Sequence, residues 1–238
     1  MRFLRKMEST GLRRVTGGAA AALLVTALVS PAKADLTVGV GQSTEPWLGF
    51  MNVFELPING GGFVFGSPWG VSDLVATFDD PANTLTLSPN TIADPDPFWY
   101  IGGGGPGAPG NKIMEANLYQ EFPAGALAGE TLTFEGTVLS NTFTPAHNTV
   151  IFIKDFAPDF SSFNITTVPA VPGPFSVSMA LDPGPGRHVQ YGFQTVGVNV
   201  WPTDVAPFGN VVIGTIPEPA SLSLLALGGL LAVRRRRA

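Results

Sequence analysis

One short stretch of the chain combines acidic and aromatic side chains, and it reads Asp94-Pro95-Asp96-Pro97-Phe98-Trp99-Tyr100. Successive side chains of an extended chain point to opposite sides, so its three aromatic rings cannot all enter one hydrophobic core. An exposed ring can stack on the apolar face of a sugar, while nearby carboxylates accept hydrogen bonds from the sugar hydroxyl groups. The stretch is therefore a candidate for ligand binding.

Trp69 and Trp201 offer two further rings, because each lies beside a proline at the edge of a turn. Together with the acidic and aromatic stretch they predict a ligand-binding site of six residues: Trp69, Asp94, Asp96, Trp99, Tyr100 and Trp201. The same rings could instead cap the ends of a hydrophobic core, an alternative that the sequence leaves open.

Groups that usually carry out catalysis are scarce. The two histidines, His147 and His188, belong to no zinc-binding pair, and no serine lies in a nucleophile-elbow sequence. His147 is predicted to lie in a solvated turn. Cysteine is absent, which excludes thiol nucleophiles and thiolate metal sites. We therefore predict no catalytic residue and no enzymatic activity, although paired carboxylates for cleaving a polysaccharide could still assemble from distant segments.

The aspartates at Asp79-Asp80 and in the stretch from Asp94 to Asp96 could supply hard oxygen ligands to a calcium ion. No EF-hand pattern is present, and aspartate also favours turns when it binds no metal ion. The sequence predicts no cofactor, and it is compatible with a structural calcium ion whose ligands it does not identify.

Charge is distributed very unevenly along the chain. The whole sequence of 238 residues has a net charge of −5, but residues 35–216 contain 16 acidic and only three basic residues, hence a net charge of −13. Such a domain lacks the basic surface that binds phosphate backbones, which excludes nucleic acid as a partner. The other ten basic residues lie in the two end segments.

Residues 1–34 have the organisation of a secretory signal peptide. A basic start is followed by the apolar run 18–29 and then by the small residues Ala32 and Ala34 in an A-x-A pattern. We predict export through the general secretion machinery and cleavage by signal peptidase after Ala34. An uncleaved N-terminal membrane anchor is the alternative.

Residues 217–238 form a second distinct segment. Pro217, Glu218 and Pro219 precede the apolar run 220–233, and the chain then ends with an arginine cluster: Arg234, Arg235, Arg236 and Arg237. A helix over the apolar run would be about 21 Å long, against a hydrocarbon core of roughly 30 Å. The run therefore predicts a short, transient anchor in the inner membrane, with its arginines on the cytoplasmic side.

This order of proline motif, short apolar helix and arginine cluster resembles the PEP-CTERM sorting signal of exported proteins from Gram-negative bacteria that make extracellular polysaccharide. The resemblance implies that exosortase, a membrane-embedded peptidase, recognises the segment and cleaves near the motif. It also implies a location in the cell envelope or outside the cell. A generic tail anchor is the alternative.

Between the two end segments, residues 35–216 show the period-two alternation of β-strands, clearest over 131–138, 175–181 and 189–193. Residues 111–121 alternate less clearly, and we predict a strand there as well. The apolar positions change parity between Phe193 and Val196, which predicts a β-bulge or two separate strands. Glycine and proline clusters separate the runs. We predict one all-β domain, an antiparallel β-sandwich or jelly roll.

The strand order over residues 111–215 resembles the galactose-binding-like jelly rolls found among carbohydrate-binding modules, and no functional residue follows from that resemblance. Together with the sorting signal it implies an exported, non-catalytic β-sandwich that binds or organises extracellular polysaccharide. A structural or adhesive matrix protein without a defined ligand is the alternative, and a polysaccharide-degrading enzyme is less favoured. The net charge of −13 favours a neutral glycan or a metal-assisted contact.

Overall fold

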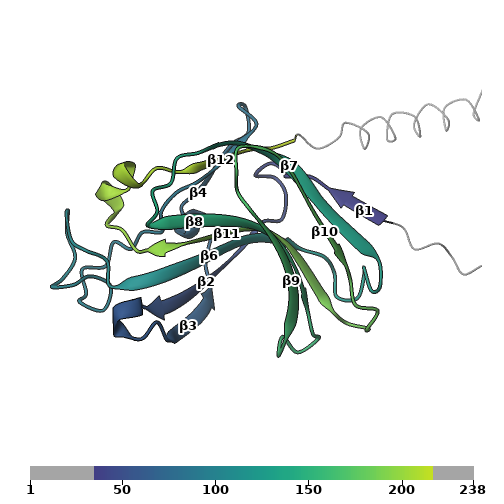
Figure 1. Cartoon of the computed structure of the whole chain (residues 1–238), viewed down its shortest axis with the longest axis horizontal. Helices are drawn as coiled ribbons and strands as arrows, with labels where there is room; N and C mark the ends of the chain where they lie inside the picture. Colours follow the sequence, from purple (N-terminus) through teal and green to yellow (C-terminus); the bar gives the residue numbers. More distant parts are fainter. Residues whose placement is uncertain (1–34, 217–238) are drawn as a thin grey trace, which may run out of the picture. The chain divides into compact units, whose positions relative to one another are not determined.

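The structure is a computed structural model that describes residues 35–216, and in this range the chain folds into two facing β-sheets (Figure 1). Sheet A contains β1 (Asp35–Val38), β4 (Ala76–Asp79), β5 (Thr84–Leu87), β7 (Thr131–Asn141), β10 (Gly173–Ala180) and β12 (Val211–Gly214). Sheet B contains β2 (Leu48–Glu55), β3 (Phe63–Pro68), β6 (Lys112–Glu121), β8 (His147–Phe156), β9 (Phe163–Pro169) and β11 (His188–Val198). Short 3₁₀ helices lie in the connections: η1 (Pro57–Asn59), η2 (Ser72–Leu74), η3 (Pro202–Asp204) and η4 (Ala206–Phe208). The prediction of a β-sandwich is confirmed.

The strand order of sheet B is β3-β2-β6-β11-β8-β9, and every neighbouring pair in it is antiparallel. In sheet A the long strand β7 pairs with β10 along one edge, and with β1 and β12 in succession along the other. The β1–β7 pair is parallel. The first and last described strands therefore both pair with β7.

The hydrophobic core lies between the sheets and is built from the alternating apolar residues of the strands. Phe134 of β7 and Phe193 of β11 are fully buried, and their ring centroids are 5.6 Å apart in an edge-on contact. Tyr191 packs against the same Phe134 ring, with the centroids 5.0 Å apart. These contacts join the centres of the two sheets, as the alternation of apolar residues predicted.

Strand β11 departs from its prediction, since it is one continuous strand. Its register with β6 and β8 runs without interruption over most of its length, so the predicted bulge or strand break was wrong. The phase change has another cause: Val196 and Val198 lie on the outer face of sheet B, where they are partly buried. Partly buried positions on the outer face also admit apolar residues, so apolar residues occur at either parity of this strand.

His147 also departs from its prediction. It begins β8, it is 5% exposed, and its Nε2 lies 3.0 Å from the carbonyl oxygen of Val198. The ring contacts the rings of Phe143 and Phe208. The expected solvated turn was wrong because the preceding residues turn back, with the His147 amide donating to Thr144, and place the ring beneath the 3₁₀ turn η4.

Within residues 35–216 no helix is both long and apolar enough to cross a membrane. The predicted signal peptide (1–34) and the predicted sorting segment (217–238) lie outside the described residues.

Candidate functional site

Tyr100, one of the six predicted ligand-binding residues, is fully buried. Its hydroxyl group lies within hydrogen-bond distance of the carbonyl oxygens of Ile92 and Val200, which share its single proton, and its ring contacts Trp201 edge-on with the centroids 5.3 Å apart. The prediction that Tyr100 contacts a ligand was therefore wrong. The turn that begins at Asp96 directs this side chain into the loop interior, where it ties two segments far apart in sequence to each other.

The neighbours of Tyr100 take part in the same turn. The carboxylate of Asp94 accepts from the Asp96 amide at 3.0 Å, and that of Asp96 accepts from the Phe98 amide at 2.7 Å. Trp99 is partly buried, with its ring edge-on to that of Phe98. Both aspartates therefore stabilise the loop through one of their oxygens.

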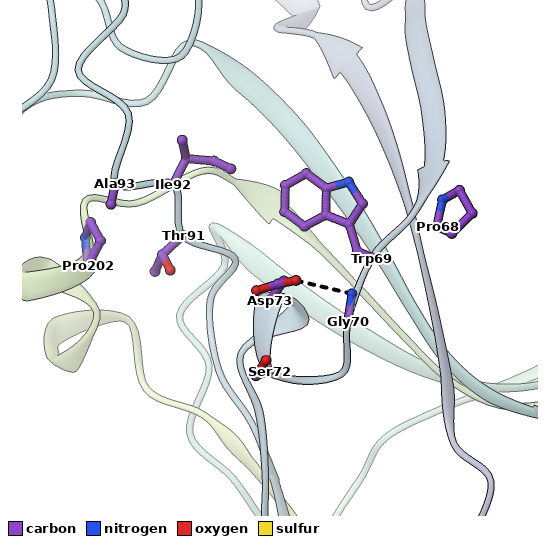
Figure 2. Close-up of a pocket in the computed structure, with 9 residues that line it drawn as sticks. All are labelled: Pro68, Trp69, Gly70, Ser72, Asp73, Thr91, Ile92, Ala93 and Pro202. Atoms are coloured by element: carbon purple, nitrogen blue, oxygen red, sulfur yellow. Dashed lines mark hydrogen bonds between the residues drawn. The ribbon is translucent and has the colours of Figure 1, made fainter.

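Trp69 lines a shallow hollow of about 580 Å³, on the other side of which lie Thr91 and Pro202 (Figure 2). Its indole N–H donates to the Ser67 hydroxyl group at 2.9 Å. Asp73, at the bottom of the hollow, accepts from the Gly70 amide at 3.2 Å, as Figure 2 shows. Of the six predicted residues this hollow includes Trp69 alone, so the structure does not bring the six together around it.

Acidic residues do not converge on a metal site in the part of the chain that the structure describes: no three Asp, Glu or His side chains there are placed to hold one ion. Asp79 accepts from the Ala82 amide within its own turn, and Asp80 accepts from the backbone amide and hydroxyl group of Ser43, 37 residues away in the sequence. The structural calcium ion remains a prediction.

A larger groove of about 780 Å³ crosses the outer face of sheet B, and none of the six predicted residues lines it. We refer to it as the sheet B groove. Its floor consists of polar side chains from the three central strands: Glu115, Asn117, Tyr119 and Glu121 of β6, Gln190 and Gln194 of β11, and Lys154 of β8. Residues two apart on a strand share a face, which is why each strand contributes alternate positions.

Gly192 lies at the middle of this floor, between Gln190 and Gln194 on β11 and opposite Tyr119 of β6. A Cβ atom at this position would overlap the backbone carbonyl oxygen of Leu118. Only glycine fits at this position, because a side chain would collide with the backbone of the neighbouring strand β6.

A continuous network of hydrogen bonds holds the floor. The side-chain oxygen of Asn117 accepts from the Lys154 ammonium group at 2.7 Å and from the Gln194 amide at 3.0 Å. The carboxylate of Glu115 accepts from the Asn52 amide at 2.8 Å. Asn117 also donates to the Glu115 backbone carbonyl at 3.2 Å. The polar groups of the floor are thereby oriented before any ligand arrives.

Lys154 is unusual because its ammonium group is buried in this network, with the residue only 6% exposed. The group lies 4.3 Å from the centre of the Phe152 ring, in a cation–π contact. Burial lowers the pKa of Lys154 to about 8, and the nearby Glu115 carboxylate partly opposes this effect. The side chain is therefore mostly protonated at neutral pH.

Apolar side chains form the two walls of the groove. Phe50 and Pro68 lie on the β2–β3 side, and on the opposite side Phe156 is followed by three exposed side chains: Phe160, Phe163 and Ile165, at 50%, 51% and 43% exposure. The Phe156 and Phe163 rings contact each other with their centroids 5.0 Å apart. Large apolar groups exposed next to an ordered polar floor are characteristic of a binding site rather than of a surface that only meets water.

The two carboxylates of the floor are too far apart to act as a glycosidase pair. Glu115 and Glu121 lie six residues apart on one strand, about 20 Å, whereas such pairs are about 5 to 9.5 Å apart. Glu121 instead lies 3.0 Å from His188 Nδ1 and accepts from the Gln190 amide at 2.6 Å. The absence of enzymatic activity remains a prediction.

Comparison with known proteins identifies the C-terminal segment. The family model of the PEP-CTERM protein-sorting motif matches residues 215–237, which confirms the resemblance drawn from Pro217, Glu218, Pro219 and the arginine cluster. The motif indicates an exported protein that is sorted by exosortase. No curated protein and no solved structure matches the chain.

Proposed function

We propose that the protein binds an extracellular polysaccharide in the sheet B groove. One observation carries the proposal: a hydrogen-bonded floor around Asn117 lies between apolar walls that include the exposed Phe160 and Phe163. Sugar rings combine apolar faces with hydroxyl groups that both donate and accept hydrogen bonds. A polar floor between apolar walls is complementary to both properties.

The size and composition of the groove agree with this assignment. Its volume of about 780 Å³ lies within the range typical of ligand sites, roughly 300 to 1,000 Å³. The floor offers amide donors and acceptors from Gln190 and Gln194. The sorting motif at residues 215–237 adds that the domain is exported, so it can meet polysaccharide outside the cell.

Affinity electrophoresis tests the proposal directly. Residues 35–216, which comprise all the described strands of both sheets, are run in native gels that contain one soluble polysaccharide each: hydroxyethyl cellulose, xyloglucan, galactomannan, dextran, alginate or polygalacturonate. We expect at least one of them to retard the protein. Substituting Phe163→Ala removes one exposed wall and should weaken the retardation roughly tenfold, since tenfold corresponds to about 1.4 kcal/mol.

Phe63→Ala is the matched control, because Phe63 is 62% exposed on β3 of the same sheet but does not line the groove. It should leave the retardation unchanged. If no polysaccharide retards the protein, the proposal is wrong and a matrix protein without a defined ligand becomes the better assignment. Release of reducing ends from any of the polysaccharides would instead favour an enzyme.

The site predicted from sequence can be tested in the same gels. Trp69→Ala, Trp99→Ala and Trp201→Ala each remove a partly exposed ring at the loop end of the sandwich. If binding takes place in the sheet B groove, correctly folded variants of this kind should bind as the parent does. If these variants lose binding and Phe163→Ala binds as the parent does, the ligand binds at the loop end and not in the sheet B groove.

A further inference from the structure

We infer that the sheet B groove selects uncharged polysaccharides and rejects polyuronates. This inference rests on the proposed function, and it specifies the class of polysaccharide that the groove accepts. It follows from the three charged side chains that line the groove, Glu115, Glu121 and Lys154, and from the partners that each of them already has.

The single cationic side chain that lines the groove, Lys154, already makes its contacts within the floor. The Lys154 ammonium group donates to Asn117 at 2.7 Å, lies against the Phe152 ring and interacts electrostatically with the Glu115 carboxylate. A carboxylate receptor normally offers the planar fork of an arginine, which binds both oxygens at once. The one arginine of residues 35–216, Arg187, binds Asp155 at 2.7 Å and Asp182 at 3.7 Å, and it is not part of the groove.

The carboxylates of Glu115 and Glu121 repel a negatively charged group of a ligand, but they can accept hydrogen bonds from a hydroxyl group. Glu115 accepts through one oxygen from Asn52, and Glu121 has contacts with Gln190 and His188, yet each carboxylate oxygen can accept more than one hydrogen bond. A sugar hydroxyl group can donate to them, whereas a uronate carboxylate cannot donate and is repelled. The charged side chains lining the groove sum to −1, in a domain with a net charge of −13.

Tyr119 adds a neutral partner for hydroxyl groups at the same place. It lies on β6 between Asn117 and Glu121 and lines the groove. Burial, and to a lesser degree the Glu121 carboxylate, raises the pKa of Tyr119. Its hydroxyl group stays protonated over the physiological range and can both donate to and accept from a sugar hydroxyl group.

The test compares neutral and acidic polysaccharides at low ionic strength in 1 mM EDTA, so that no divalent cation bridges carboxylates. A neutral polysaccharide from the panel should retard residues 35–216, and polygalacturonate and alginate should not. The double substitution E115Q/E121Q removes both negative charges from the floor. It should raise affinity for polygalacturonate by roughly threefold for each charge removed, an effect that 0.5 M NaCl should abolish.

Glu135→Gln is the matched control, because Glu135 is an exposed carboxylate on β7, in the other sheet. It makes the same change of charge away from the groove and should leave the affinity for polygalacturonate unchanged. Circular dichroism and thermal unfolding should show that all variants are folded.

The inference and the proposed function fail in distinguishable ways. If no polysaccharide binds, the proposed function is wrong. If polyuronates bind the parent protein in EDTA as tightly as neutral chains do, the function stands and the charge selectivity is overturned. The selectivity is also overturned if E115Q/E121Q gains no more affinity for polygalacturonate than Glu135→Gln does.

Discussion

The ammonium group of Lys154 crosses over Gly192 to reach the side-chain oxygen of Asn117, 2.7 Å away. Lys154 is paired with Gln190 on β11, and Asn117 is paired with Gln194 on the same strand, so the bond spans the strand diagonally. Gly192 lies between these two glutamines and has no side chain of its own. The bond links β8 to β6 across β11, and it places the one cation of the groove at its centre.

Gly192→Ala should destabilise the domain, because the added Cβ atom would overlap the Leu118 carbonyl oxygen, a backbone atom that cannot move away freely. We expect a loss of roughly 1 to 3 kcal/mol in the free energy of unfolding, measured by urea denaturation. Gly62→Ala is the control, because a Cβ atom there would meet nothing within 4 Å. Equal stability of the two variants would contradict the account of Gly192 as a position that admits no side chain.

Lys154 should make stability depend on alkaline pH. Its pKa is about 8 in the folded protein and 10.5 in its ordinary state, so between these values the unfolded chain holds more protons. The free energy of unfolding should therefore rise with pH across this window, by about 3 kcal/mol at most, relative to a Lys154→Met variant. Urea denaturation of both proteins at pH 7, 8, 9 and 10 measures the difference. A difference that stays constant with pH would show that the ammonium group is not buried as described.

His147 should destabilise the domain in mild acid. Burial lowers the pKa of His147 below its ordinary value of 6.5, and its Nδ1 has no hydrogen-bond partner among the described residues. As the pH falls below about 6.5, His147 is protonated in the unfolded chain but stays neutral in the folded protein. The free energy of unfolding therefore falls until the pH reaches the pKa of His147 in the folded protein. His147→Gln removes this titration and should flatten the loss between pH 6.5 and 5.

Thermal unfolding from pH 5 to 7.5 checks this prediction. The same substitution at the other histidine, His188→Gln, should leave the acid-dependent loss from His147 in place. If His147→Gln keeps the full loss of stability, another group is responsible.

Tyr100→Phe should affect stability and spare ligand binding. The substitution leaves the carbonyl oxygens of Ile92 and Val200 without their buried donor, at a cost of about 1 to 3 kcal/mol in the free energy of unfolding. Because Tyr100 is fully buried and lies outside the sheet B groove, retardation by polysaccharide should not change at temperatures where the variant is folded. Weaker binding without a loss of stability would show that Tyr100 does belong to the ligand-binding site.

Much of the fold could be predicted from the sequence because its signal is local. Along β7, Leu132 and Phe134 face the core and the intervening threonines do not, and this alternation follows from strand geometry alone. The prediction was wrong at Val196 and Val198 of β11, because apolar residues on the outer face look the same in the sequence as core residues. Only the neighbouring strands show which face each residue occupies.

The candidate site could not be predicted in the same way. Phe50, Asn117 and Lys154 are far apart in the sequence, and they meet on one face only because β2, β6, β11 and β8 are neighbours in register. The alternating polar residues of β6 were visible as a strand, but nothing local indicated that they form the floor of a groove. Conversely, the sequence predicted that Tyr100 contacts a ligand, but the loop places its side chain in the interior.

The sequence by itself determined where this protein goes. Export and sorting signals are read as linear segments, so a basic start, a small-residue cleavage pattern, a proline motif and an arginine cluster suffice to predict them, and the family match at residues 215–237 confirms the sorting motif. Tertiary structure alone decided which side chains share a surface. Hydrogen bonding between strands sets their order and register, and those two properties place Lys154 over Gly192, bury Tyr100 and form the sheet B groove.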